Sequence, residues 1–134
     1  MIRWAALALL LWTGAAAAED SYPPLDVLLK TTQTAIGEPI VYPDGQAEVS
    51  VVLVTMAPGQ KTGWHVHDAP LIAYMLEGEI TVDYGENGKR TYREGDALVD
   101  ALKSRHDGEN TGDGPTRILV VFAGAVGTAN TVSE

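Results

Sequence analysis

The chain has 134 residues, a length suited to one domain, and its 18 acidic and nine basic side chains give a formal net charge of −9. An acidic surface repels the phosphates of nucleic acids and anionic lipids, so we expect neither nucleic acid nor a membrane among the partners of the mature chain. The absence of cysteine excludes disulfides. Stability must then come from a packed core, a metal or a second subunit.

The first 18 residues have the pattern of a secretory signal peptide. "MIR" supplies a basic start, "WAALALLLW" an apolar run, and "AAAA" a small-residue cleavage site that ends at Ala18. The stretch from Trp4 to Ala18 is too short to span a bilayer comfortably, which favours cleavage over a retained membrane anchor. We therefore predict a periplasmic or secreted protein that begins near Glu19, and loss of Arg3 changes its formal charge from −9 to −10.

Residues 19–37 are predicted to form an N-terminal arm that lies against the main body. Paired prolines stand near the start of this arm, and "LDVLLK" after Pro24 permits one short helix. No repeat or low-complexity linker follows, so residues 38–134 are predicted to form the single folded domain.

Short β segments separated by turn signals fill residues 38–134. In chain order they are "EPIVY", "EVSVVLVTM", "LIAYMLEGEITVDYG", "KRTYREG", "DALVDAL" and "TRILVVFAGAV". The third is expected to break into two strands near Gly78, and Asn87 and Gly88 in "ENGK" are expected to supply the positive φ angles of a hairpin turn. No long stretch has helical periodicity, so we predict an all-β sandwich or barrel.

Two of the three histidines alternate along one segment, "GWHVHDAPLIAYMLEG". His65-x-His67 in a strand directs both imidazoles to the same face, so two nitrogen ligands can meet in the interior. Gly59 stands six positions before His65, and Gly78 stands eleven positions after His67.

The third histidine has its own spaced motif, in which His106 follows Gly95 by eleven positions and precedes Asn110 by four. Together these spacings resemble the two motifs of the cupin superfamily, G-x5-H-x-H-x3-4-E-x6-G and G-x5-P-x-G-x2-H-x3-N. The resemblance covers roughly residues 46–123. It implies a double-stranded β-helix, or jelly-roll barrel, of two packed antiparallel sheets with a metal inside. Asn110 is expected to make a turn or a structural hydrogen bond.

In metal-binding cupins three histidines and the motif glutamate are the usual ligands, so the resemblance implies that His65, His67 and His106 bind a metal. Imidazole nitrogen suits zinc, copper, iron and nickel, and we expect a divalent transition metal, namely Fe, Mn, Zn, Ni or Cu. Three protein ligands leave coordination positions for water or substrate, whereas closed structural sites use four.

The motif glutamate is missing. Leu71 occupies its position under the shorter spacing and Ile72 under the longer, and neither can bind metal. We predict three protein ligands, at least two open or water-filled positions, and Leu71 as an apolar wall beside the ion. The alternative is that Asp68 supplies a carboxylate through a strand bulge, although strand alternation directs its side chain away.

The second motif also departs from the family pattern. Ala101 and Lys103 replace its proline and glycine, so the turn before His106 must be made otherwise. Asp100 and Asp107 are candidates to orient a histidine from outside the ligand set.

A ligand set without the glutamate is uncharged, so a divalent ion would keep its full charge and act as a stronger Lewis acid toward an anionic or chelating molecule. We expect a small polar or anionic molecule in the barrel.

An enzyme of this kind would be a metal-dependent dioxygenase, lyase or isomerase. A non-catalytic binding or sensing protein and a metal-free structural cupin remain alternatives, because the fold does not determine the chemistry. Small cupins commonly pair, so a homodimer is also expected.

Overall fold

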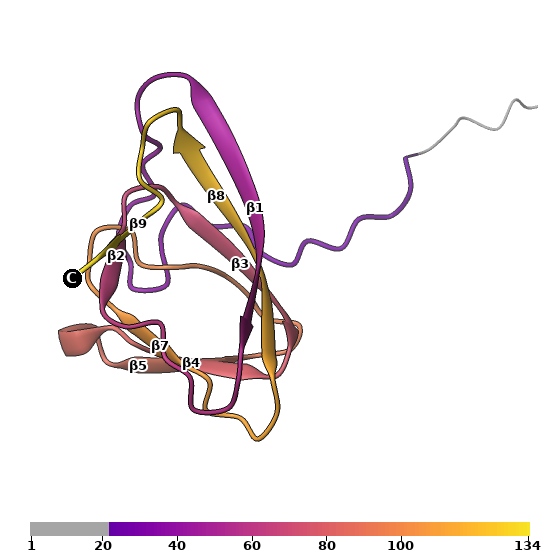
Figure 1. Ribbon diagram of the computed structural model, residues 1–134. Helices are drawn as coiled ribbons and strands as arrows, with labels where there is room; N and C mark the ends of the chain where they lie inside the picture. The colour runs from indigo at the N-terminus through magenta and orange to yellow at the C-terminus, as the bar shows by residue number, and fades with distance from the viewer. Residues whose placement is uncertain (1–21) are drawn as a thin grey trace, which may run out of the picture.

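Nine strands and one short 3₁₀ helix make up the secondary structure of residues 22–134, the part of the chain that the computed structural model describes (Figure 1). The elements are β1 (Ala47–Met56), β2 (His65–His67), β3 (Leu71–Glu77), β4 (Glu79–Asp83), η1 (Gly85–Asn87), β5 (Lys89–Arg93), β6 (Ala97–Val99), β7 (Asp107–Glu109), β8 (Thr116–Ala125) and β9 (Thr131–Ser133). The predicted signal peptide lies outside this range. No helix within it is long and apolar enough to cross a membrane.

The strands pair antiparallel in three groups, ordered β1-β8-β3-β6, β5-β4-β7 and β2-β9. Paired backbone hydrogen bonds between His65 and His106, each 3.0 Å, tie the β2-β9 pair to the chain just before β7. In Figure 1 the long strands β1, β8 and β3 form one wall, and the other two groups close the barrel around its interior. The predicted all-β jelly-roll architecture is confirmed.

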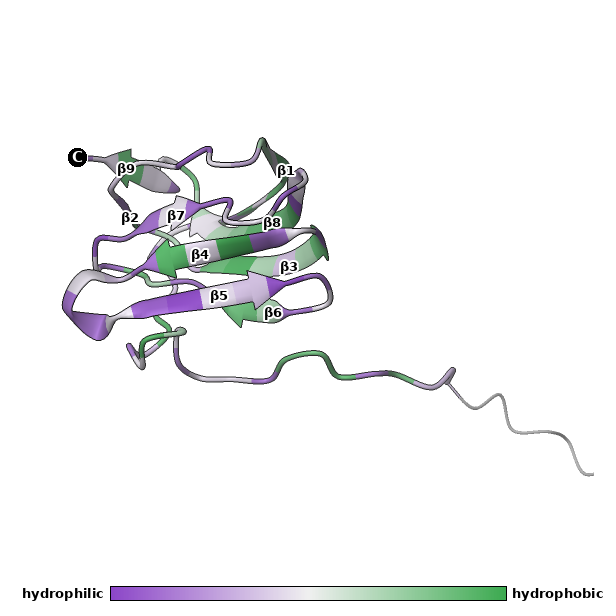
Figure 2. Ribbon diagram, turned by 90° about the horizontal axis from the view of Figure 1, so that it is seen from below, coloured by the Kyte–Doolittle hydropathy of each residue, from purple (hydrophilic) through white to green (hydrophobic). Residues whose placement is uncertain are grey.

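The core follows from alternation along the strands, because side chains of a strand point to opposite faces in turn. In β8 the inward positions are Thr116, Ile118, Val120 and Phe122, and all four are buried. Figure 2 shows hydrophobic residues along β3 and β8 and hydrophilic ones over much of β5, which faces outward at the edge of its sheet. The part of the barrel interior that β3 and β8 line is therefore largely apolar.

Gly78 separates β3 from β4, where the sequence predicted a break. Its φ is +75°, and an added Cβ would lie 2.5 Å from the carbonyl oxygen of Pro115. A side chain is excluded both by backbone conformation and by the packed neighbouring chain.

The hairpin between β4 and β5 is not the two-residue turn that was predicted. Gly88 has a positive φ of 81°, but Asn87 does not. The loop instead contains η1, because the Asp83 carboxylate accepts a hydrogen bond from the Gly85 N–H (2.9 Å) and stabilises a tighter start to the turn.

Two predictions for the N-terminal part are wrong. "LDVLLK" forms no helix, and "EPIVY" forms no strand beyond an isolated bridge between Gln33 and Pro39. A six-residue helix without a packing surface does not offset the cost of nucleation. Pro39 and Pro43 lack the N–H groups that a strand would need.

The predicted arm is tied to the main body at its C-terminal end, where the Ile40 N–H donates to the Thr32 carbonyl oxygen (3.0 Å) and Gln33 bridges Pro39. Residues 22–33 are exposed, and the first of them run away from the barrel in Figure 1. Thr34 is buried, and the Ala35 N–H donates to the carbonyl oxygen of Val99 (2.7 Å), which docks this segment on the end of β6. The segment of residues 33–40 therefore belongs structurally to the barrel.

Candidate metal centre

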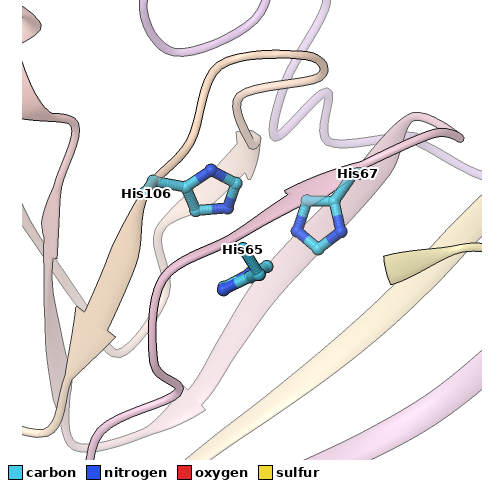
Figure 3. A group of neighbouring side chains, drawn as sticks. All are labelled: His65, His67 and His106. Carbon is cyan, nitrogen blue, oxygen red and sulfur yellow. The ribbon is translucent and has the colours of Figure 1, made fainter. Parts of the chain in front are cut away.

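The structure brings the three histidines together in the barrel interior. His65 and His67 lie on one face of β2, as the alternation predicted, and the backbone pairing places His106 opposite His65. All three are buried, their ring centroids are 4.4–5.0 Å apart, and one nitrogen of each lies within 4.8 Å of the others. Figure 3 shows the rings gathered from two separate segments.

The outer nitrogen of each ring is fixed by a backbone carbonyl oxygen. Since a carbonyl can only accept, each Nδ1 must carry the proton and donate it. The acceptors are Gly63 for His65 (2.7 Å), Asn130 for His67 (3.1 Å) and Ser104 for His106 (2.9 Å). In the neutral rings Nε2 then carries a free lone pair, the arrangement that orients histidines in metal sites.

Two of these inner nitrogens have no hydrogen-bond partner. The Nε2 atoms of His67 and His106 are fully buried and unpaired. Buried polar atoms in folded proteins nearly always have a partner, and a cation between the rings would satisfy both. The donor set fits a divalent transition metal, so the three histidines could hold a metal ion.

Asp100 is the acidic residue beside this cluster. Its Oδ2 lies 3.3 Å from Nε2 of His106 and 3.9 Å from Nε2 of His67, and its side chain is only 13% exposed. The other oxygen, Oδ1, accepts hydrogen bonds from the Tyr84 hydroxyl (2.8 Å) and the Ala101 N–H (2.9 Å). The carboxylate is thus held from behind with one oxygen facing the histidines.

The two motif regions place their histidines in different electrostatic settings. Burial lowers the pKa of His67 to about 4, because a charged ring would lose its hydration there, and Asp100 offsets this only in part. Burial also acts to lower the pKa of His106, but Asp100 outweighs it and raises this pKa above the ordinary value. His67 is therefore neutral at neutral pH.

Asp100 itself is ionised. Burial acts to raise its pKa, but His106 and the Tyr84 hydroxyl outweigh burial and hold the pKa below the ordinary value. Burial, followed by the Asp100 charge, raises the pKa of Tyr84 far above its usual range, so this phenol stays protonated and donates to the carboxylate.

A cavity of about 230 Å³ lies beside the histidines. Its polar lining consists of Thr62, His65, His67, Asp100, His106, Thr131 and Ser133. The rest of the wall is Gly108 and apolar side chains, including Leu71, which is buried as predicted for a wall of the site. Within the described part of the chain, no lysine or arginine lines this cavity.

Three other candidates lie away from the cavity. Asp68 faces outward and its Oδ1 pairs with the Lys103 ammonium (2.6 Å), as strand alternation predicted. Asp107 accepts a hydrogen bond from the Thr62 hydroxyl (3.2 Å) and orients no histidine ring. Asn110 is buried and structural, because its amide donates to two backbone carbonyls and accepts one N–H.

The sequence did not identify Glu38 as a residue that supports the turn before His106. Its carboxylate accepts hydrogen bonds from the N–H of Leu102 (2.7 Å), the N–H of Ser104 (3.1 Å) and the hydroxyl of Ser104 (2.7 Å). These bonds shape the turn before His106, from which the proline and glycine of the motif are missing. Leu102 and Ser104 follow Glu38 in the chain by 64 and 66 positions. No local sequence pattern indicates a contact over this separation.

Together the barrel and the converging imidazoles define a class of jelly-roll proteins with an internal histidine cluster. The sequence profile of the family described as "Cupin domain" matches residues 52–122. The chain belongs to the cupin family, as its two histidine motifs predicted.

Solved structures of larger cupins resemble the chain. An oxalate oxidase in complex with glycolate matches with a TM-score of 0.55 and 27% identity, covering 63% of this chain and 45% of that protein. The DMSP lyase DddQ from Ruegeria pomeroyi matches with a TM-score of 0.55 and 27% identity over 63% of this chain and 42% of its own.

The oxalate decarboxylase of Bacillus subtilis, a protein with Mn(II) centres, matches with a TM-score of 0.52 and 29% identity over 63% of this chain and 23% of its own. The chain thus spans less than half the length of these three proteins. None of the curated proteins compared with the chain matches it.

Proposed function

We propose that the protein binds one divalent transition metal through His65, His67 and His106 and presents it to a small molecule in the cavity. The observation that carries this proposal is the pair of buried, unpaired Nε2 atoms of His67 and His106. Leaving two buried nitrogens without partners is costly unless an ion completes the site. Similarity to a protein with Mn(II) centres supports the same conclusion.

The ligand that best fits the cavity is a small molecule with an oxygen donor, such as a short carboxylate. The volume of about 230 Å³ is below the roughly 300–1,000 Å³ of pockets that hold drug-sized molecules. Polar groups gather at the histidines and the remaining wall is apolar, so the donor atom would face the metal. Oxalate and glycolate, named for two of the similar structures, have this chemistry.

A metal titration followed by a ligand screen tests this function. Metal-free protein would be titrated with Mn²⁺, Fe²⁺ and Zn²⁺, and the loaded protein would then be mixed with oxalate or glycolate under air. We expect one ion per chain and a change in the electron paramagnetic resonance spectrum of Mn²⁺ when the carboxylate binds. Turnover would identify an enzyme, and binding without turnover a binding or sensing protein. Failure of all three metals to bind would contradict the proposal.

We propose that the chain is exported, on the strength of the signal-peptide pattern in residues 1–18. Protein recovered from the periplasm or the medium should begin at or near Glu19. Recovery of a chain that still begins at Met1 from the membrane fraction would contradict export.

We propose a homodimer formed through β1. This strand is at the edge of the four-stranded sheet, and Val49, Val51 and Leu53 on it are 65%, 63% and 50% exposed. An exposed apolar edge strand is prone to pair with a second copy, and antiparallel pairing about a twofold axis makes such an edge self-complementary. A sedimentation mass equal to one mature chain at micromolar concentrations would contradict the dimer.

A further inference from the structure

Leu71 and Asp100 are direct neighbours across two paired strands. Ile72 of β3 lies opposite Val99 of β6, so the next antiparallel pair is Leu71 and Asp100. The Asp100 N–H donates to the carbonyl oxygen of Leu71 (3.0 Å), which confirms the pairing one residue beyond β6. Side chains opposite each other in such a pair share a face, with Cβ atoms about 4.5–5.5 Å apart. A carboxylate therefore stands beside the position from which the motif glutamate is missing.

The Asp100 carboxylate is oriented toward the histidines by contacts behind it. Tyr84 and the Ala101 N–H both donate to Oδ1 and leave Oδ2 free. The distances from Oδ2 to the Nε2 atoms of His106 and His67 are 3.3 and 3.9 Å. Two ligands about 2.1 Å from a shared ion are separated by about 3.0 Å at right angles and about 3.4 Å in a tetrahedron. Oδ2 lies at a spacing appropriate to a fellow ligand of His106.

With both rings neutral, the Nε2 atoms of His67 and His106 donate no hydrogen bond to Oδ2, and at 3.9 Å the contact with His67 is too long for one. With the Nδ1 protons donated to backbone carbonyls, the neutral rings present lone pairs on Nε2. Nitrogen and carboxylate lone pairs that face each other at 3.3 Å repel unless a positive charge, either a proton on His106 or a metal ion, lies between them. A proton on His106 would leave His67 without a partner, because its Nε2 is 3.9 Å from Oδ2, whereas a metal ion bound by all three atoms would satisfy both rings.

We propose that Oδ2 of Asp100 is the fourth protein ligand of the metal, replacing from β6 the glutamate that is missing at Leu71 in β3. This inference rests on the proposed metal function. It changes the expected charge of the site, because three neutral imidazoles and one carboxylate leave a divalent ion with a net charge of +1. It also gives Tyr84 a role as a positioning residue that holds the carboxylate.

The experiment compares Co²⁺ binding to the wild-type chain with binding to three variants, Asp100→Asn, Asp68→Asn and the double variant Leu71→Glu/Asp100→Asn. Asparagine keeps the size of Asp100 and an oxygen for Tyr84, but it removes the charge. Asp68→Asn is the matched control, because it removes an acid next to His67 that faces outward. Affinity is measured by the visible absorption of Co²⁺, and a crystal structure of each loaded protein locates the ligands.

We expect Asp100→Asn to weaken Co²⁺ binding by at least about 10-fold, since even residues that only contact ligands contribute 10- to 100-fold. Asp68→Asn should bind as the wild type does, and the double variant should recover most of the loss. The wild-type crystal structure should place Oδ2 about 2.0–2.2 Å from the ion.

An Oδ2 more than about 3 Å from the ion, with water between them, would overturn this inference even if affinity fell. Equal Co²⁺ affinity of the wild type and Asp100→Asn would overturn it as well. In both cases a Co²⁺ ion on the three histidines would leave the proposed function standing. A wild-type chain that binds no Co²⁺ would overturn both.

Discussion

The two histidine-bearing regions of the barrel have kept different parts of the family pattern. The first, residues 59–78, keeps both glycines and both histidines but has Leu71 where the carboxylate is expected. The second, residues 95–110, lacks the expected proline and glycine but places Asp100 in the cavity. Because β3 and β6 are paired, Leu71, which replaces the motif glutamate in the first region, lies next to Asp100 of the second region. The position of Asp100 beside the histidines therefore depends on strand pairing and not on the spacing of a linear motif.

The regions also differ in what supports them. The first depends on a glycine, since Gly78 allows the chain after β3 to pass close to the backbone of Pro115. The second depends on a distant residue, since Glu38 accepts the hydrogen bonds that shape its turn. Substitutions in the two regions should therefore have different consequences.

The largest effect on stability outside the cavity is expected for Gly78→Ala. Its Cβ would lie 2.5 Å from a backbone oxygen at a φ of +75°, so we expect a loss of about 3 kcal/mol or more in the free energy of unfolding. Gly59→Ala is the control, because Gly59 has the same φ but open space around it, and it should cost about 1–2 kcal/mol. Urea denaturation measures both, and equal losses would contradict the close approach.

Glu38→Gln should destabilise the chain by about 2 kcal/mol, since hydrogen bonds to a charged acceptor each contribute about 1.5–3 kcal/mol and the amide retains part of this. Burial acts to raise the pKa of Glu38, but the donors on Leu102 and Ser104 outweigh it and lower the pKa below its usual value.

A lowered carboxylate pKa stabilises the fold above the unfolded-state value of about 4.5, and the gain is lost as the pH falls through the folded-state pKa. Stability of the wild type should therefore drop more steeply below pH 4.5 than that of Glu38→Gln. If the free energies of unfolding of the wild type and Glu38→Gln changed with pH in the same way, the ionised Glu38 carboxylate would not be what stabilises the turn.

Acid should release the metal through His106 before it affects His67. The pKa of His106 is raised above 6.5, so a proton competes for its Nε2 already near neutral pH, whereas the pKa of His67 is about 4. Metal affinity should fall at least about tenfold per pH unit below the His106 pKa. Titration of Zn²⁺ at several pH values checks this, and an affinity constant from pH 7 to pH 5 would contradict histidine ligation.

The smallest effect on metal affinity is expected for Leu71→Ala. No ligand is lost, so affinity should stay within about threefold of the wild type, while a larger cavity changes the preference among small carboxylates. Truncation of a buried leucine also costs about 2–5 kcal/mol of stability. A release of metal comparable to that in His67→Ala would mean that the carboxylate and imidazoles alone do not define the site.

Most of the barrel could be predicted because its strands bury one face and alternate with period two. β3, β4, β5, β6 and β8 lie within predicted segments, β1 begins one residue before its predicted segment, and His65-x-His67 correctly indicated β2. β7 and β9 have three residues each, too few for a periodic signal. They form only because longer strands and the His65–His106 pairing bring partners to them.

The histidines could be predicted from spacing, but the surroundings of the site could not. The sequence identified Asp100 only as a candidate to orient a histidine, because its place depends on strand register between β3 and β6. Glu38 reaches across more than sixty residues to the second motif. Tertiary contacts of this kind leave no pattern in local sequence. In "EPIVY" the apolar run suggested a strand, although Pro39 and Pro43 lack the N–H groups that a strand needs.

The most direct test of the metal centre is elemental analysis of untagged wild-type protein and the His106→Ala variant, purified side by side without added metal. Three converging imidazoles predict close to one transition metal per wild-type chain and almost none in the variant, while both chains keep the same circular dichroism spectrum. Equal metal content in the two folded proteins, or none in either, would contradict a metal centre built on these histidines.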